Sequence, residues 1–229
     1  MIDKRKFYIN GSWINPIIKN DFEVINPSNE RSYAIISLGS KKDVDLAVSA
    51  AKKAFITWSQ VDKKEKIILL ENLFKIYKSR WDEITHTMSD EMGAPLDWSS
   101  SAQTASGADH INDFILRLKN FEFETKFKNQ SNNYIVHEPI GVCGLITPWN
   151  WPINQITLKV IPALATGCTM ILKPSEIAPL SGMLFAEIID QAGFPAGVFN
   201  LVNGDGAGVG TDLSSHSDID MISFTSFTT

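Results

Sequence analysis

The sequence predicts an α/β protein built on a parallel, helix-flanked sheet of incomplete Rossmann-like type, preceded by an N-terminal helical segment and a β-hairpin. From residue 141 onward, short apolar runs alternate with helical stretches, which is the pattern of β-α-β units. Strands with one solvent-exposed face alternate apolar and polar residues, and these runs do not show that alternation. We therefore expect strands that helices cover on both sides.

Composition and charge limit the classes of partner. The chain has 229 residues, of which 44% are hydrophobic and 21% charged, and its formal net charge is −5. This charge gives no general attraction to nucleic acid or to anionic membrane surfaces. No segment approaches the roughly 20 unbroken apolar residues of a membrane span, and charged residues occupy the N-terminus where a signal peptide would be apolar. We expect a cytoplasmic protein with no nucleic-acid or membrane partner.

The cysteines and histidines do not indicate a disulfide scaffold or a zinc site. There are two cysteines and four histidines, and the histidines are scattered without ligand spacing. Cys143 and Cys168 each lie inside an apolar run, so we expect buried structural thiols. No metal site is predicted.

Before residue 121 the pattern predicts strands and then helices. Residues 7–38 contain the runs FYINGSW, FEVINP and YAIISL, separated by Asn-Gly and Asn-Pro turn signals. Ser40 followed by Asp43 is a short form of the capping box and predicts a helix start. A second helix is expected from near Asp62, and two further helical segments end around Arg117. The predicted buried faces of the first two helices comprise Val44, Ala47, Val48, Ala51, Phe55 and Trp58, then Ile67, Leu70, Leu73, Phe74 and Tyr77.

Residues 121–139 alternate as two strands, FEFETKF and NYIVHEP, around a polar turn. This pattern predicts a hairpin that projects or packs at a sheet edge. Beyond it we expect strands at GVCGLIT, CTMILK, VFNLV and DMISFT, and helices near 154–165, 179–191 and 206–214.

The segment Thr147-Pro148-Trp149-Asn150-Trp151-Pro152 follows the first strand of the predicted parallel sheet. Two prolines and two tryptophans make a stiff, bulky turn. A rigidly held amide at Asn150 is a suitable donor to an oxyanion. The alternative is a structural turn whose Asn caps the helix beginning near Ile153.

After the second strand comes Lys173-Pro174-Ser175-Glu176. A carboxylate and an amine at the carboxyl end of a parallel strand could hold a nucleotide, with Glu176 on ribose hydroxyls and Lys173 on ribose or phosphate. The alternative is a surface ion pair, with Ser175 as a helix N-cap.

Two further candidate turns follow the third and fourth strands. Residues 203–210, NGDGAGVG, contain many glycines but fit G-x-G-x-x-G in no register, so the motif is weak. They could still open a helix whose N-terminus faces an anion. Residues 224–229, FTSFTT, form a hydroxyl-rich turn beside the other candidates.

Taken together, these segments resemble the aldehyde dehydrogenase superfamily. The matching pieces are FYINGSW, the INPS step, ITPWNWP, PALATGCTMILKPSE, GFPAGVFNLVNG and ISFT, in the order and spacing of that family and over essentially the whole chain. The resemblance implies oxidation of an aldehyde to a carboxylic acid with NAD, or NADP as the alternative, through a covalent thioester. It also implies a homo-oligomer when the protein is full length.

The resemblance assigns roles to particular residues. Asn150 is similar to the amide that stabilises the oxyanion of the tetrahedral intermediate. Lys173 and Glu176 resemble the adenosine-ribose ligands, with Ser175 beside them. Ile146, Thr147, Pro148 and Trp149 resemble the wall against the cofactor. Gly206 and Gly210 fall in the turn and helix at the adenine, and Thr225 and Ser226 match the start of the turn that meets the pyrophosphate.

The resemblance also implies a division of the chain. Residues 1–120 would be the N-terminal segment of the cofactor-binding domain, 121–140 the oligomerisation hairpin, and 141–229 a truncated parallel-sheet NAD-binding part, with the catalytic domain absent. Neither Cys143 nor Cys168 matches the motif of the family's nucleophile. Two alternatives therefore stay open: a truncated product that at most binds a nucleotide or assists assembly, and another nucleotide-binding α/β protein.

One departure from the family lies in the last strand and turn. The family usually reads ISFTGST where this chain reads ISFTSFT, so Ser226 replaces a Gly and Phe227 replaces a Ser. A Gly lets the backbone approach a phosphate closely, and a Phe would crowd it. The departure puts the predicted pyrophosphate contact in doubt, and the ending itself could be an altered terminus.

Overall fold

The computed structural model describes residues 1–128 and 132–226. Within this part, the centre is a six-stranded sheet in the order β11-β8-β9-β10-β2-β3. Four of its strands are parallel: β8 (Val142–Ile146), β9 (Thr169–Lys173), β10 (Phe199–Leu201) and β11 (Met221–Phe224). Every residue of β8, β9 and β10 is buried. The predicted α/β class, with a parallel sheet covered on both faces, is confirmed.

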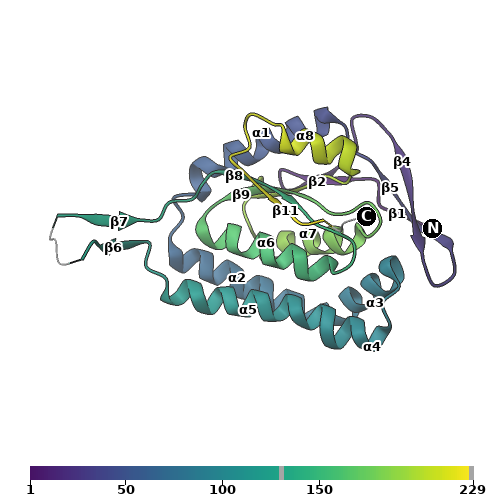
Figure 1. The fold of residues 1–229 in the computed structure, drawn as a ribbon, viewed down its shortest axis with the longest axis horizontal. Helices are drawn as coiled ribbons and strands as arrows, with labels where there is room; N and C mark the ends of the chain where they lie inside the picture. Colours follow the sequence, from purple (N-terminus) through teal and green to yellow (C-terminus); the bar gives the residue numbers. More distant parts are fainter. Residues whose placement is uncertain (129–131, 227–229) are drawn as a thin grey trace.

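Helices cover the two faces of this sheet in layers (Figure 1). Helices α6 (Pro152–Thr166) and α7 (Leu180–Ala192) lie on one face, and α1 (Lys41–Trp58) and the short α8 (Thr211–Ser214) on the other. A further layer, α2 (Lys63–Ser79) and α5 (Ala105–Asn120), packs on α6 and α7. Helix α3 (Trp81–Met92) contacts α7 beside them. Among the described helices, none has the length and apolar character needed to cross a bilayer.

The order of the parallel strands reverses at β8. The chain proceeds from β8 to β9 to β10 in one direction, and β11 then pairs with the opposite edge of β8. In open α/β sheets, ligands bind in the crevice outside the carboxyl ends of the strands at such a reversal. The ends of β8 and β11 therefore define where a site is expected.

The N-terminal strands extend this sheet, which the sequence pattern did not predict. Strand β2 (Phe7–Ile9) pairs antiparallel with β10, and β3 (Ser12–Ile14) pairs antiparallel with β2. The other early strands, β1 (Ile2–Asp3), β5 (Arg31–Ser37) and β4 (Asp21–Asn26), form a separate three-stranded sheet in that order.

The predicted capping signal at the first helix is present in part. Asp43 is fully buried, and its carboxylate accepts hydrogen bonds from the backbone N–H of Ser40 at 2.8 Å and from the Ser40 hydroxyl at 2.6 Å. The carboxylate thus satisfies a donor at the start of α1. It also accepts from the N–H of Ile17 and ties the loop after β3 to the helix.

The segment between α3 and α5 is not a simple helix. Helix α4 (Leu96–Trp98) runs directly into a π-helical turn, η1 (Ser99–Thr104), which continues into α5. A π turn rotates the side chains that follow it relative to an α-helix, and such turns are frequent at functional sites. The predicted end of this helical segment near Arg117 is three residues early, since α5 ends at Asn120.

The predicted hairpin is present, with short strands. Strands β6 (Glu124–Lys126) and β7 (Tyr134–Val136) pair antiparallel and project from the body of the molecule (Figure 1). All six strand residues are exposed. Residues 129–131 of the predicted turn lie outside the described part.

Two apolar clusters form the core, one on each face of the sheet. The larger contains Cys143, Leu145, Met170 and Leu172 and packs against helices α2, α5, α6 and α7. The smaller contains Val142, Ile146 and Ile171 and packs against α1. Successive residues of β8 and β9 alternate between the clusters, as a strand covered on both faces requires.

Candidate active site

The carboxyl ends of three strands bring the predicted residues together. The N–H of Thr147 donates to the carbonyl of Lys173 at 3.1 Å, and the N–H of Thr225 donates to the carbonyl of Ile146 at 3.1 Å. The segments that follow β8, β9 and β11 therefore start side by side at one edge of the sheet. This edge includes the strand reversal between β8 and β11.

Asn150 lies in the turn between β8 and α6. The helix starts at Pro152 with Trp151 as its N-cap residue, and no side chain caps it. The alternative interpretation of Asn150 as a helix cap is therefore wrong. Within the described part, the Asn150 side-chain amide makes no hydrogen bond, whereas its backbone carbonyl accepts one from Nε2 of Gln103 at 3.3 Å. Asn150 as a whole is half-buried.

Lys173 and Glu176 form the predicted pair. The Lys173 Nζ lies 3.3 Å from Oε2 of Glu176 and donates to the carbonyl of Pro174 at 3.1 Å. The Lys173 side chain is 4% exposed and that of Glu176 is 26% exposed. A lysine carries three donors, so one remains for a ligand. Burial lowers the pKa of Lys173, and the charges of Glu176 and Asp205 act against this shift. The alternative of a simple surface pair does not fit a lysine that is buried.

Ser175 does not have the capping role that was the alternative for it. Helix α7 starts at Leu180 with Pro179 before it, so Ser175 is too far away to cap. Its hydroxyl accepts from the N–H of Ile177 at 3.3 Å and closes a local turn. Ser175 is buried beside Lys173 and Glu176, where it shapes the turn that presents them.

The glycine-rich segment forms a π-helical turn, η2 (Gly206–Gly210), that opens the four-residue α8. The Asp205 carboxylate already accepts from the N–H of Gly208 at 2.6 Å. The Asp205 carboxylate therefore satisfies one N–H group of this turn, and the binding of an anion by the others stays a prediction. Gly206 is exposed, and a Cβ added there would meet nothing within 4 Å. Gly210 lies beside Lys173, because a Cβ added at Gly210 would be 4.0 Å from the Cδ atom of Lys173.

Two polar atoms at this edge of the sheet are buried without a partner in the described part. They are Oγ1 of Thr147, after β8, and Oδ1 of Asn203, after β10. A buried polar atom without a hydrogen bond costs free energy. Asn203 was not among the predicted site residues.

Lys159 is a second residue that the sequence did not single out. It lies on α6, nine residues after Asn150, and its Nζ donates to the hydroxyl of Ser223 on β11 at 2.9 Å. Burial lowers its pKa. The amine thus links α6 to β11.

The remaining predicted residues surround this edge. Pro148 is buried directly after Thr147, while Trp149 is half-buried in the same turn. Thr225 is half-buried and Ser226 exposed immediately after β11. Phe227, the second departure from the family pattern, lies outside the described residues.

The two thiols lie at the opposite edge of the sheet. Cys168 directly precedes β9, and Cys143 is the second residue of β8, so both lie toward the amino ends of their strands. Both are buried, as predicted. The neighbouring Cys168 thiol and burial raise the pKa of Cys143, and the neighbouring Cys143 thiol lowers the pKa of Cys168. Neither sulfur can reach the carboxyl edge.

A large cavity lies away from this edge of the sheet. It has a volume of about 630 Å³ and lies between the N-terminal strands and α7, lined by Lys4, Lys6, Trp13 and Glu187. It contains none of the predicted site residues, and no described group of three or more His, Cys, Asp or Glu side chains is arranged to hold a metal ion.

The described residues form an α/β protein with a strand reversal in its parallel sheet, a buried lysine paired with Glu176 at the end of β9, and a turn containing Asn150 after β8. The aldehyde dehydrogenase family model matches residues 13–229, and the chain belongs to this family.

Relatives of this family match along almost the whole chain. A 3-succinoylsemialdehyde-pyridine dehydrogenase from a Pseudomonas species is 49% identical over 229 residues, which is 100% of this chain and 47% of the relative. A crystal structure of an aldehyde dehydrogenase from Bartonella henselae superposes with a TM-score of 0.97 at 55% identity, over 98% of this chain and 47% of that one.

Another similar structure carries ligands. It is a mutant of aldehyde dehydrogenase C from Pseudomonas syringae in complex with NAD⁺ and octanal, with a TM-score of 0.92 and 44% identity over 95% of this chain and 44% of that one. The chain thus spans about half the length of the relatives it matches.

Proposed function

We propose that this chain is the NAD-binding half of an aldehyde dehydrogenase, an enzyme that converts an aldehyde, NAD⁺ and water to a carboxylic acid, NADH and a proton. The observation that carries the proposal is the convergence of Asn150, the Lys173–Glu176 pair and Thr225 at one edge of the sheet, beside the strand reversal. Membership of the family and the NAD⁺ complex of a relative support it.

The residues present fit an adenosine-containing cofactor. Glu176 can accept from ribose hydroxyls, and Lys173 has one donor left for the same sugar or a phosphate. Gly206 leaves open space where a flat base could approach η2. The unpartnered Oγ1 of Thr147 and Oδ1 of Asn203 lie at the same edge and can hydrogen-bond a bound group.

In the proposed reaction, NAD⁺ supplies the acceptor for the hydride that leaves the substrate. The contribution of this chain is to hold the cofactor and to polarise the aldehyde. The Asn150 side-chain amide donates to the carbonyl oxygen and stabilises the negative charge that develops there when a nucleophile adds. The turn holds this donor in place before the reaction, so no reorganisation is required.

The test uses a chimaera that joins residues 1–224 to the second half of the Bartonella henselae enzyme, here called the chimaera. We expect it to bind NAD⁺ in a calorimetric titration and to form NADH from short-chain or aromatic aldehydes. A chimaera that folds but does not bind NAD⁺ would refute the cofactor assignment. NAD⁺ binding without turnover on any aldehyde would refute the proposed reaction.

A second function is a non-catalytic fragment that binds a nucleotide or assists assembly. The observation that favours it is the position of Cys143 and Cys168 at the amino edge, away from Asn150. The two functions differ in their outcome with the chimaera, because only the half of an enzyme forms NADH once the second half is supplied. Titration of the isolated chain with NAD⁺ measures the binding function alone.

We also propose that the full-length protein is a homo-oligomer and acts in the cytoplasm. The β6–β7 hairpin supports the first part, since Tyr134, Ile135 and Val136 are between 44% and 56% exposed on a projecting element. Exposed apolar side chains on such an element are typical of subunit interfaces. Light scattering of the chimaera with and without the hairpin residues changed to Ser tests this assignment.

A further inference from the structure

Gln103 is a buried polar residue outside the turn that contains Asn150, and it contacts that turn directly. It is 2% exposed, and its Nε2 donates to the backbone carbonyl of Asn150 at 3.3 Å. Its Oε1 is buried without a partner in the described part of the chain. A buried amide that satisfies only one of its two ends costs free energy, so its presence requires an explanation.

The π-helical turn η1 explains how Gln103 reaches this position. Gln103 is the fifth residue of η1 (Ser99–Thr104), which contacts α6. The turn is itself tied down on both sides: the Ser99 hydroxyl donates to the carbonyl of Thr85 at 2.8 Å, and the Tyr77 hydroxyl donates to the carbonyl of Thr104 at 2.8 Å. The extra residue per turn in a π-helix changes the direction of the side chains after it.

The bond from Gln103 acts on the peptide group between Asn150 and Trp151. Because Trp151 precedes the first residue of α6, this peptide group lies outside the hydrogen-bonding pattern of the helix. A donor on its carbonyl fixes the rotation of the peptide group and hence the direction of the Asn150 Cα–Cβ bond. The Asn150 side-chain amide itself has no hydrogen bond among the described residues, so the backbone must hold its direction.

We propose that Gln103 is a positioning residue for the oxyanion donor Asn150. It touches neither substrate nor cofactor, and it acts by holding the Asn150 peptide group from the side of η1. This inference rests on the proposed function, because it assigns Gln103 a part in the same reaction.

The test compares Gln103→Met with Ser100→Ala. Methionine is close to glutamine in length but cannot donate. Ser100→Ala is the matched control: its hydroxyl accepts from Nε1 of Trp81 at 2.9 Å within the same π-helical turn, and it does not contact Asn150. In the chimaera, Gln103→Met should lower kcat about 10- to 100-fold, since small misplacements of a catalytic group have effects of this size. The dissociation constant for NAD⁺ and the KM for aldehyde should not change.

Gln103→Glu supplies a second variant that keeps the shape of the side chain. A protonated carboxyl can donate to the Asn150 carbonyl, whereas a carboxylate cannot. The ratio of its kcat to that of the unchanged chimaera should therefore fall as pH rises, and Ser100→Ala should show no such dependence. A flat ratio, or a loss of kcat in Ser100→Ala equal to that in Gln103→Met, would overturn the inference.

A structural measurement separates this inference from the proposed function. In the isolated chain labelled with ¹³C and ¹⁵N, Gln103→Met should shift the resonances of the Asn150 carbonyl and the Trp151 amide, and Ser100→Ala should leave both in place. If the chimaera is inactive but these shifts occur, the proposed function fails and the contact stands. If neither resonance moves in Gln103→Met, Gln103 does not hold this peptide group and the inference is wrong.

Discussion

Asn150 owes its proposed role to a turn in which prolines and tryptophans restrict the backbone. Changing Asn150 to Ala in the chimaera should lower kcat by about 10²–10³, because an oxyanion donor acts where charge develops in the transition state. NAD⁺ binding should be unaffected. Asn154→Ala is the control, since this residue lies one turn later and donates to His110 at 2.9 Å. If the Asn150 variant unfolds, or loses NAD⁺ affinity with turnover intact, the residue is structural.

Glu176 should set a preference for NAD over NADP. Its carboxylate can accept from a free 2′-hydroxyl, whereas a 2′-phosphate would meet a like charge in a partly desolvated site. In calorimetric titrations of the chimaera, NAD⁺ should bind at least about tenfold more tightly than NADP⁺, which is ~1.4 kcal/mol. Lys173 offsets part of the repulsion.

The control for this preference is a pair of variants. Glu176→Gln should narrow the difference between the cofactors, and Glu138→Gln, an exposed carboxyl after β7, should leave it unchanged. Tighter binding of NADP⁺ to the unchanged protein would show that Glu176 does not face the ribose.

Among the elements, α3 and α7 are joined through one buried carboxylate. Glu91 on α3 is 1% exposed and accepts from the N–H groups of Leu180 and Ser181, at 2.5 and 3.0 Å, and from the Ser181 hydroxyl. It thus satisfies free donors at the start of α7. Burial raises the pKa of Glu91 from 4.5 to about 7, and the hydrogen bonds from Ser181 and Leu180 oppose this shift.

This shift predicts a pH dependence of stability. The folded state holds the Glu91 proton up to about pH 7, whereas the unfolded chain releases it near 4.5. Between these values the folded state binds more protons, so the free energy of unfolding falls as pH rises, by on the order of 3 kcal/mol at most. Urea unfolding at a series of pH values should show this fall. Glu91→Gln should remove it, and Glu83→Gln, an exposed residue of the same helix, should retain it. If the free energy of unfolding of Glu91→Gln falls with pH as steeply as that of the unchanged protein, another group causes the effect.

The glycines before α8 should differ in what their substitution changes. A Cβ at Gly204 would overlap the Val209 side chain, so Gly204→Ala should lower the free energy of unfolding by about 1–3 kcal/mol. Gly206 has open space, so Gly206→Ala should leave stability unchanged but weaken NAD⁺ binding if the adenine lies there. Thermal unfolding and calorimetry measure the two effects. An unchanged NAD⁺ affinity in Gly206→Ala would show that the adenine does not lie against η2.

Elements differed in how far sequence could predict them. Strands β8 and β9 were predictable because each is a continuous apolar run, and Asn150, Lys173 and Glu176 followed as the polar residues after those runs. The pairing of Tyr8 with Leu201 was not predictable, because the periodicity of a strand does not indicate which distant strand it pairs with. The π turns η1 and η2 were likewise missed, since no residue pattern distinguishes them from α-helix starts.

The site residues that the sequence did not predict were missed for a common physical reason. Gln103 and Lys159 come from the middle of helical segments, where a polar residue is usually at the solvent face. Asn203 follows a strand, but it directly precedes the glycine-rich segment, whose glycines were the predicted site residues there. In each case the packing of a distant element, and not the local pattern, makes the residue part of the edge of the sheet.

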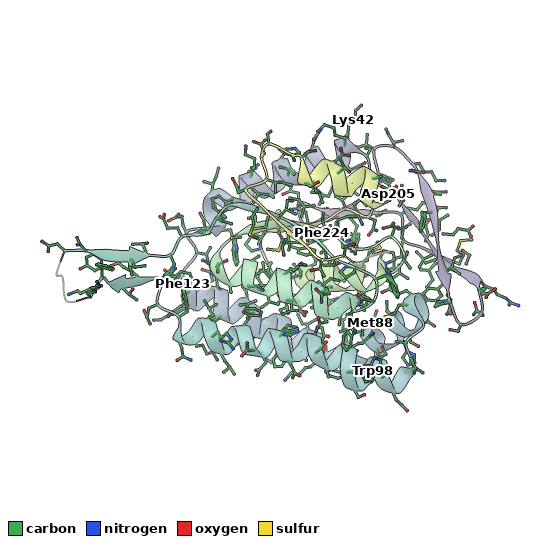
Figure 2. All side chains as sticks on the ribbon, in the orientation of Figure 1. Lys42, Met88, Trp98, Phe123, Asp205 and Phe224 are labelled. Atoms are coloured by element: carbon green, nitrogen blue, oxygen red, sulfur yellow. The ribbon has the colours of Figure 1, made fainter. Side chains whose placement is uncertain are left out.

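At the scale of the whole molecule, the sheet has an edge strand with apolar side chains in solvent. Strand β11 pairs only with β8 among the described strands. Phe224, which Figure 2 labels, is the last residue of β11 and is 63% exposed. Ile140, two residues before β8, is 57% exposed, and Ile56 on α1 is 72% exposed. Open strand edges and exposed apolar side chains favour self-association. The isolated chain should therefore associate at high concentration, and the chimaera less so.

The isolated chain should also fail to oxidise aldehydes. The proposed reaction requires a thiolate that attacks the carbonyl and a base that activates water for hydrolysis. Cys168 has a lowered pKa, but it is 4% exposed at the amino edge of the sheet, and Asn150 lies beyond the carboxyl edge. Cys143 is fully buried, and its pKa is raised. NADH formation with short, long and aromatic aldehydes should therefore match a heat-treated control. Steady turnover by the purified chain, abolished by Cys143→Ser or Cys168→Ser, would show that a thiol of this chain is the nucleophile, and that the sheet opens enough to expose it.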